Sequence, residues 1–158
     1  MSQRTISDGD ARIVVDERES PLLLITWFGE PNEAMITEYF DWMVAMVERF
    51  HASGGKYVLI TDASSAKRPR PSVRQQIAER TDALPPYTAD INIGNYVVID
   101  NPLIRGALTA MQWMSRSEWT NKTVGSCTEA IRLGLEDLDR HGIARPRGLD
   151  PLAYQRPA

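Results

Sequence analysis

The chain has 158 residues, enough for one domain with a sizeable hydrophobic core. Its 42% hydrophobic and 25% charged residues are typical of a globular protein, and a formal net charge of −3 argues against a general attraction to nucleic acid or anionic membranes. The single cysteine, Cys127, excludes an internal disulfide, and two distant histidines, His51 and His141, do not make a zinc set.

The N-terminal residues are polar and lack the apolar core of a signal peptide, and no apolar run approaches the length of a membrane span. With the cysteine count, this predicts a protein of the reducing cytoplasm. We expect no cofactor, no metal, no transmembrane segment and no nucleic-acid partner.

The first half of the chain predicts two paired strands followed by a long helix. Residues 1–11 are polar and are expected to be loose, whereas residues 12–16 and 22–28 are expected to be strands joined by a tight antiparallel connection. Asn32 is expected to cap a helix whose apolar positions, through residue 50, recur at the helical spacing, and Gly54-Gly55 is expected to end it.

Residues 56–62 predict the central strand of the sheet. They are apolar at successive positions, as in a parallel strand that is buried on both faces, and Asp62 stands at the carboxyl end, where α/β sheets present their sites. Residues 63–71 are too rich in proline and charge to continue a strand, so we expect a loop.

Two more helices and a strand are expected next. Ser72 with Gln75 matches a capping box and predicts the start of the second helix. A strand over 93–99 precedes Asn101, which is expected to cap a third helix reaching to about 114. That helix is apolar nearly all round, so a partner subunit is one way to cover it.

The last elements are a short strand, a helix and a tail. Residues 120–124 are expected to be a strand, and Ser126 with Glu129 forms a second capping box that opens the last helix. Residues 143–158 hold three prolines and three arginines without periodicity and are expected to be a tail or arm. The third helix and the apolar residues of this tail predict a homodimer.

This order, ββαβαβαβα, predicts a single layered α/β domain over residues 12–142, with a mostly parallel five-stranded sheet and four helices. The strand ending Leu59-Ile-Thr-Asp62, the loop to a capped helix and the strand 95–99 resemble bacterial STAS-like proteins. So do residues 105–113 of the third helix, with the closing strand and the helix at Glu129-Ala130. These include sporulation anti-sigma factor antagonists and an uncharacterised branch likened to the CRAL-TRIO lipid-transfer fold.

The resemblance implies a regulatory module. In the antagonists, a serine at a helix start, within an Asp-Ser-Ser-Gly turn, is phosphorylated to break a protein complex. Ser72 lies at about that place here and is therefore a phosphorylation candidate, although its neighbours Arg70, Pro71 and Val73 replace the acid and the glycine.

The edge after the central strand is the candidate binding surface. Lys67 and three arginines surround a predicted helix N-terminus, where backbone N–H groups favour an anion. The alternative is a surface loop with solvated charges. The candidate binding residues are Asp62, Ser64, Ser65, Arg68, Arg70, Ser72, Arg74, Asp100 and Arg105.

No residue is predicted to be catalytic. Asp62 could act as a base, but capping of the following loop is the commoner role of such an acid. Cys127 is expected to be a small buried thiol. Serine hydrolysis is not expected, because no histidine lies near these serines in the sequence and no G-x-S-x-G motif is present.

Three functions stay open, and activity as an enzyme is the least favoured. The leading hypothesis is a non-enzymatic module that binds a protein partner or an anionic group through residues 62–74. The second is a carrier of a small apolar or acidic ligand, suggested by four tryptophans and six methionines. The third is an enzyme that uses Asp62 and the arginines on a phosphorylated or carboxylated substrate.

Overall fold

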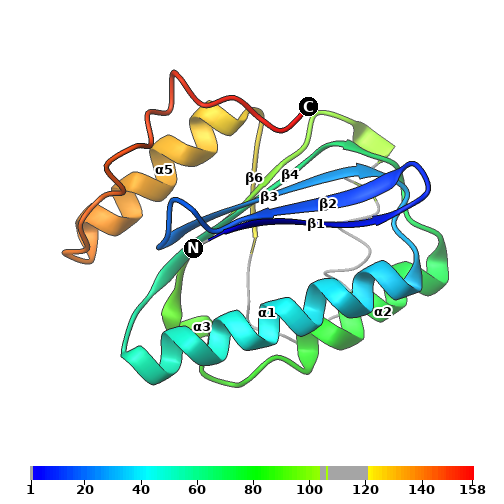
Figure 1. The fold of residues 1–158 in the computed structure, drawn as a ribbon, viewed down its shortest axis with the longest axis horizontal. Helices are drawn as coiled ribbons and strands as arrows, with labels where there is room; N and C mark the ends of the chain where they lie inside the picture. Colours follow the sequence, from blue (N-terminus) through cyan, green and yellow to red (C-terminus); the bar gives the residue numbers. More distant parts are fainter. Residues whose placement is uncertain (1, 104–105, 107–120) are drawn as a thin grey trace.

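The computed structural model describes residues 2–103, 106 and 121–158, which form a six-stranded sheet with helices on both faces (Figure 1). The strands are β1 (Gln3–Asp8), β2 (Ala11–Asp16), β3 (Leu22–Gly29), β4 (Tyr57–Ala66), β5 (Asn92–Val98) and β6 (Lys122–Val124). The helices are α1 (Glu33–Ser53), α2 (Pro71–Asp82), α3 (Thr88–Ile91) and α5 (Cys127–Arg140). A single α/β domain is therefore confirmed for the part of the chain that the structure describes.

The strands lie in the sheet in the order in which they occur in the sequence. β1, β2 and β3 pair antiparallel, whereas β3, β4, β5 and β6 pair parallel. Each parallel strand is added on the same side of the strand before it, and right-handed crossovers of this kind place their helices on one face of the sheet. Helices α1 and α2 lie together on that face. Helix α5 follows the last strand and covers the opposite face (Figure 1).

The N-terminus corrects one prediction. Residues 1–11 were expected to be loose, but Gln3–Asp8 form β1, which pairs with β2 along its whole length. Only Ile6 of this strand is buried, at 2% exposure, and it packs into the core beneath α1. A single apolar residue among polar neighbours gives almost no periodic signal, which is why the sequence did not predict this strand. With β1 the sheet has six strands rather than the five expected.

Strand β4 is central, as predicted, with β3 and β5 as its neighbours. Its side chains alternate between the two cores, with Tyr57 and Leu59 on the α1 side and Val58 and Ile60 on the α5 side. The strand nevertheless continues beyond Asp62 to Ala66, where a loop was expected. Pairing of this extension with the end of β3 overrides the local composition.

The first helix begins and ends as predicted, whereas the second does not. Asn32 caps α1 by accepting a hydrogen bond from the Met35 N–H at 2.9 Å, and Gly54 ends it with a φ of 70°. Helix α2 begins at Pro71, and its N-cap, Arg70, makes no side-chain capping bond. The capping box predicted at Ser72 is therefore wrong, because proline already fits the first helical position.

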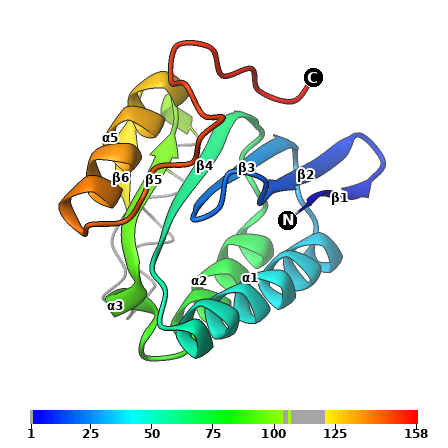
Figure 2. The ribbon, with the colours of Figure 1, turned by 60° about the vertical axis from the view of Figure 1, so that its left-hand side comes forward.

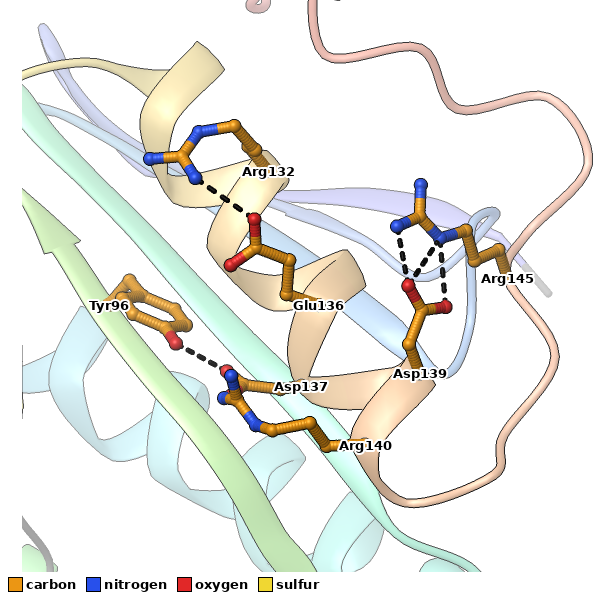
Figure 3. Close-up of polar contacts among 7 residues, drawn as sticks. All are labelled: Tyr96, Arg132, Glu136, Asp137, Asp139, Arg140 and Arg145. Atoms are coloured by element: carbon orange, nitrogen blue, oxygen red, sulfur yellow. Dashed lines mark hydrogen bonds and ion pairs between the residues drawn. The ribbon is translucent and has the colours of Figure 1, made fainter.

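Helix α5 is fastened to the sheet by a buried polar cluster and a close contact. The carboxylate of Asp137, on α5, accepts hydrogen bonds from the Tyr96 hydroxyl on β5 and from the Arg140 guanidinium (Figure 3). Gly134 lies where an added Cβ would come within 2.9 Å of a Val58 methyl group, so only glycine lets α5 approach β4 this closely. The side chain of Ser126 caps this helix as predicted.

The segment after α5 packs on the domain rather than extending from it. Figure 2 shows residues 143–158, in orange and red, returning beside α5 toward the carboxyl end of β4. Ile143, Leu149 and Tyr154 pack against the core on the α5 side, whereas Leu152 is 87% exposed. The predicted tail is thus part of the covering layer of the sheet.

Most of the predicted third helix and the site residue Arg105 lie outside the described residues. Of that region, Asn101 accepts a hydrogen bond from the Leu103 N–H at 2.9 Å, in keeping with its predicted capping role. Within the described ranges, no helix has both the length and the apolar character needed to cross a membrane.

Candidate functional site

The predicted site residues fall on two sides of the sheet. Asp62 contacts Cys127 at the start of α5, so its side chain lies on the α5 side. Arg68 and Arg70 precede α2 and Arg74 lies in its first turn, and this helix packs on the α1 side through Val73. The structure therefore does not bring Asp62 and these arginines together.

Asp62 is the centre of a buried polar cluster at the carboxyl end of β4. Its side chain is 3% exposed. One carboxylate oxygen accepts the Ser64 N–H at 3.0 Å and the Ser64 hydroxyl at 2.5 Å. The other accepts a hydrogen bond from the Cys127 thiol at 3.3 Å and forms an ion pair with the Arg156 guanidinium at 2.8 Å. The charge of the buried acid is thus paired, and four donors approach its two oxygens.

The contacts to Ser64 explain a bulge at this point of the sheet. Thr26 of β3 pairs with Asp62, but Phe28 pairs with Ser65, so β4 contains one extra residue. An aspartate that accepts the N–H two residues later stabilises such an irregular backbone. The capping role of Asp62, weighed above against a role as a base, is the one seen here.

Arg156 reaches Asp62 from the C-terminal segment and makes two further contacts. Its guanidinium donates to the Ser65 hydroxyl at 3.0 Å, and its central carbon lies 5.4 Å from the centre of the Phe28 ring. Arg12 stacks on the same ring at 4.1 Å and donates a hydrogen bond to the carbonyl oxygen of Ala158. Sequence reasoning missed Arg156 because its partners are remote in the chain and no periodicity marks its segment.

Burial shifts two neighbouring acids toward their neutral forms. It raises the pKa of the Cys127 thiol to about 12, and the Asp62 carboxylate adds to the shift by its charge and its hydrogen bond. Burial likewise raises the pKa of the Tyr154 hydroxyl to about 12, although a hydrogen bond with Thr26 opposes the shift. At neutral pH this cluster therefore contains a thiol and a phenol, neither of which is an activated nucleophile.

The basic segment, defined as residues 67–74, has three exposed cations, Lys67, Arg68 and Arg70, and a half-buried one, Arg74. Lys67 and Arg68 are exposed, and Arg70 lies 3.5 Å from the Glu30 carboxylate. Arg74 donates to the Pro69 carbonyl oxygen at 2.9 Å, which ties it to its own turn.

Ser72, within the basic segment, donates its hydroxyl to the Glu33 carboxylate at 2.9 Å. Backbone hydrogen bonding, this contact and the charge of Arg70 lower the pKa of Glu33. The serine therefore links α2 to the start of α1.

Asp100 and Arg105 are the last two residues of the predicted site. Asp100 is exposed and follows β5, whose Val98 pairs with Asp62, so it belongs to the same edge of the sheet. Arg105 lies outside the described residues. Among the residues that the structure describes, no three histidine, cysteine or acidic side chains are grouped so that they could hold a metal ion.

Comparison with protein-family models finds no match to this chain, and comparison with curated proteins finds none either.

Proposed function

We propose that the protein is a regulatory or binding module of STAS-like type that binds an acidic segment of a protein partner through the basic segment. The element order supports the resemblance, with a hairpin leading into parallel strands and helices on both faces. The observation that carries the proposal is the contrast between Asp62, whose carboxylate is enclosed, and the exposed cations beyond β4.

A binding role accounts for this contrast better than a catalytic one. A general base needs a carboxylate that can reach a substrate proton. One oxygen of Asp62 already accepts hydrogen bonds from Ser64, and the other accepts one from Cys127 and forms an ion pair with Arg156. The basic segment needs no such activation, because recognition of an acidic partner requires only accessible positive charge.

The local electrostatics favour a partner rich in carboxylates. Lys67 and Arg68 are exposed, and the pairing of Arg70 with Glu30 at 3.5 Å is an exposed contact of small value that another carboxylate can replace. The first turn of α2 contains no acidic residue, and its N-cap side chain makes no capping bond. The helix dipole therefore adds to the positive potential of the segment.

The test is affinity capture from a native lysate with wild-type protein and an Arg68→Ala, Arg70→Ala, Arg74→Ala variant. A matched control variant removes the same charge elsewhere through Arg4→Ala, Arg132→Ala and Arg145→Ala, three arginines in exposed ion pairs. We expect the first variant alone to lose a partner, with the loss mimicked by high salt. Recovery of the same proteins by all three would exclude the basic segment as the binding surface.

The carrier function has one supporting observation. The Tyr57 hydroxyl is fully buried between the sheet and α1, and no hydrogen-bond partner for it occurs among the described residues. A ligand with a polar group could supply that partner. Native mass spectrometry of gently purified protein would detect such a ligand, and a mass equal to that of the chain alone, with no thermal shift on addition of acyl lipids, would count against a carrier.

A further inference from the structure

The C-terminal residues Tyr154–Ala158 lie on a surface formed by the ends of three strands. We define this tail-binding surface by the five residues that contact the segment, which are Arg12, Thr26, Phe28, Asp62 and Ser65. It lies on the α5 side of the sheet, whereas α2, which contains the end of the basic segment, packs on the α1 side through Val73.

Apart from the Ala158 carbonyl oxygen, which accepts from Arg12, the segment contacts this surface through side chains, and no backbone ladder joins it to a strand among the described residues. Arg156 contacts Asp62, Ser65 and Phe28, and Tyr154 contacts Thr26. The backbone N–H groups of Leu152 and Ala153 bond locally to Asp150. A segment held in this way can leave the domain without the loss of a strand, which is the property of a locally unfolding unit.

The contacts of Arg156 match the geometry of a guanidinium group. One N–H of Arg156 meets Asp62 at 2.8 Å while another meets Ser65 at 3.0 Å, and the plane of the group lies near the Phe28 ring. A lysine ammonium has neither the fork nor the plane needed for these three contacts together. Because Asp62 is 3% exposed, departure of Arg156 leaves a buried carboxylate unpaired unless another cation replaces it.

We propose that the tail-binding surface is a recognition site for an extended, arginine-bearing segment of a partner protein, and that Tyr154–Ala158 occupy it as an internal competitor. The chemistry of the partner segment is inferred from the segment bound in cis, because its arginine and tyrosine show which groups the surface accepts. Any replacement must bring a cation to Asp62, and the fork and plane of the site favour arginine over lysine. This proposal does not depend on the basic segment, because that segment is proposed to bind an acidic partner and the tail-binding surface a basic one.

The test measures binding of a labelled synthetic peptide with the sequence of residues 150–158 to the full-length chain. The competitor is weakened by Tyr154→Ser with Arg156→Ser in the protein. We expect this variant to bind the peptide at least about tenfold more tightly than wild type, whose own tail competes at an effective concentration of about millimolar. In the peptide, replacement of the arginine by lysine or alanine should weaken binding by about tenfold or more.

Variants of the surface distinguish specific binding from loss of the fold. Adding Asp62→Asn should abolish peptide binding, and adding the milder Ser65→Ala should weaken it several-fold while the melting temperature stays that of the parent. Leu152→Ala, at an exposed tail position, should leave wild-type behaviour unchanged. A folded double variant without saturable binding, or with equal affinity for the arginine and alanine peptides, overturns the proposal. The proposal is also overturned if the wild-type protein is a dimer that becomes monomeric on Arg156→Ser, because the segment would then be exchanged between two copies of the chain.

Discussion

Cys127 shows how neighbouring side chains can override the effect of a helix terminus. It is the first residue of α5, a position where the helix dipole favours a thiolate. Its pKa is nevertheless raised to about 12, first by burial and then by the charge and hydrogen bonding of Asp62, with Arg156 acting in the opposite direction. The thiol is a hydrogen-bond donor to the buried acid, and this role requires the neutral form.

The first prediction follows from that pKa. In the native protein, alkylation of Cys127 by iodoacetamide should be about two to three orders of magnitude slower at about pH 9 than in urea, because only the thiolate reacts. The native rate should keep rising up to about pH 12, whereas the unfolded rate should level off near pH 9. Mass spectrometry of quenched samples gives both rates.

Asp62→Asn is the control for Cys127, because it removes the charge that helps to raise the thiol pKa. Native alkylation at a given pH should then be faster than in wild type. A plateau of the wild-type native rate near pH 9 would show that the thiol has an ordinary pKa and would contradict the assignment.

At the scale of elements, two similar sequence patterns have different outcomes. Ser72 with Gln75 and Ser126 with Glu129 both match a capping box, yet only Ser126 accepts a hydrogen bond from the backbone of its helix. Pro71 explains the difference, since its fixed φ and missing N–H suit the first helical position and move the start of α2 ahead of Ser72.

The second prediction compares these two serines. Ser126→Ala should lower the free energy of unfolding by about 1 kcal/mol, as expected for loss of an N-cap. Ser72→Ala should change it by no more than about 0.5 kcal/mol, because the serine is exposed and caps nothing. Urea denaturation of the two variants measures both effects, and equal losses would mean that Ser72 does cap α2.

The third prediction concerns the contact between α5 and the sheet. Gly134→Val should lower the free energy of unfolding by about 1–3 kcal/mol, because its side chain must displace Val58 and Leu22, which an added Cβ would meet at 2.9 and 3.1 Å. Gly125→Val is the matched control, as a Cβ there meets nothing within 4 Å. Thermal and urea unfolding compare the pair. A Gly134→Val protein as stable as the control would show that α5 can move away from β4 at no cost.

At the scale of the whole molecule, sequence patterns predicted those elements whose signal is local. Helix α1 has apolar periodicity with a cap at each end, and β4 is apolar on both faces, so both were found. Strand β1 and the extension of β4 were missed because pairing with a neighbouring strand, rather than composition, holds them in place. The sequence alone does not reveal which strand will accept a polar segment.

The candidate site was predicted in part for the same reason. Asp62 and Ser64 are two positions apart, and their hydrogen bond follows from a local rule. Arg156 contacts Ser65 from 91 positions away, and only the path of the tail over the sheet brings the two together. The arginines of the basic segment are closer to Asp62 in sequence, but no contact between them and Asp62 is seen among the described residues, because the chain turns into α2, which packs on the α1 side.

Self-association also depends on the path of the tail. The predicted homodimer rested in part on three apolar residues of the tail. Two of them, Tyr154 and Leu149, pack against the α5-side core, and the third, Leu152, is exposed. A homodimer stays a prediction, and sedimentation at high concentration tests it. If Leu152 forms part of such an interface, Leu152→Glu should shift the equilibrium toward monomer.

The last prediction concerns alkaline pH and arises from the buried phenols and the thiol taken together. Burial raises the pKa values of Tyr39, Tyr57 and Tyr96, and those of Cys127 and Tyr154 are raised to about 12. In the folded state these groups keep their protons at a pH where the unfolded chain has lost them. The folded state then binds more protons, so stability falls as pH rises. Their contribution is fully present below about pH 9, where the unfolded thiol begins to ionise, and is lost progressively above it.

Urea unfolding between about pH 8 and 11 should therefore give a free energy of unfolding that is steady at first and then declines. The decline should follow the rise in tyrosinate absorbance of the unfolded chain. Tyr57→Phe is the sharpest control, because its hydroxyl is fully buried and, among the described residues, has no hydrogen-bond partner to lose. Removal of a group that must stay protonated in the fold should make the decline less steep. A wild-type free energy that stays constant to about pH 11 would mean that these hydroxyl groups and the thiol titrate as they do in the unfolded chain. The sheet and its covering layers would then admit water to them.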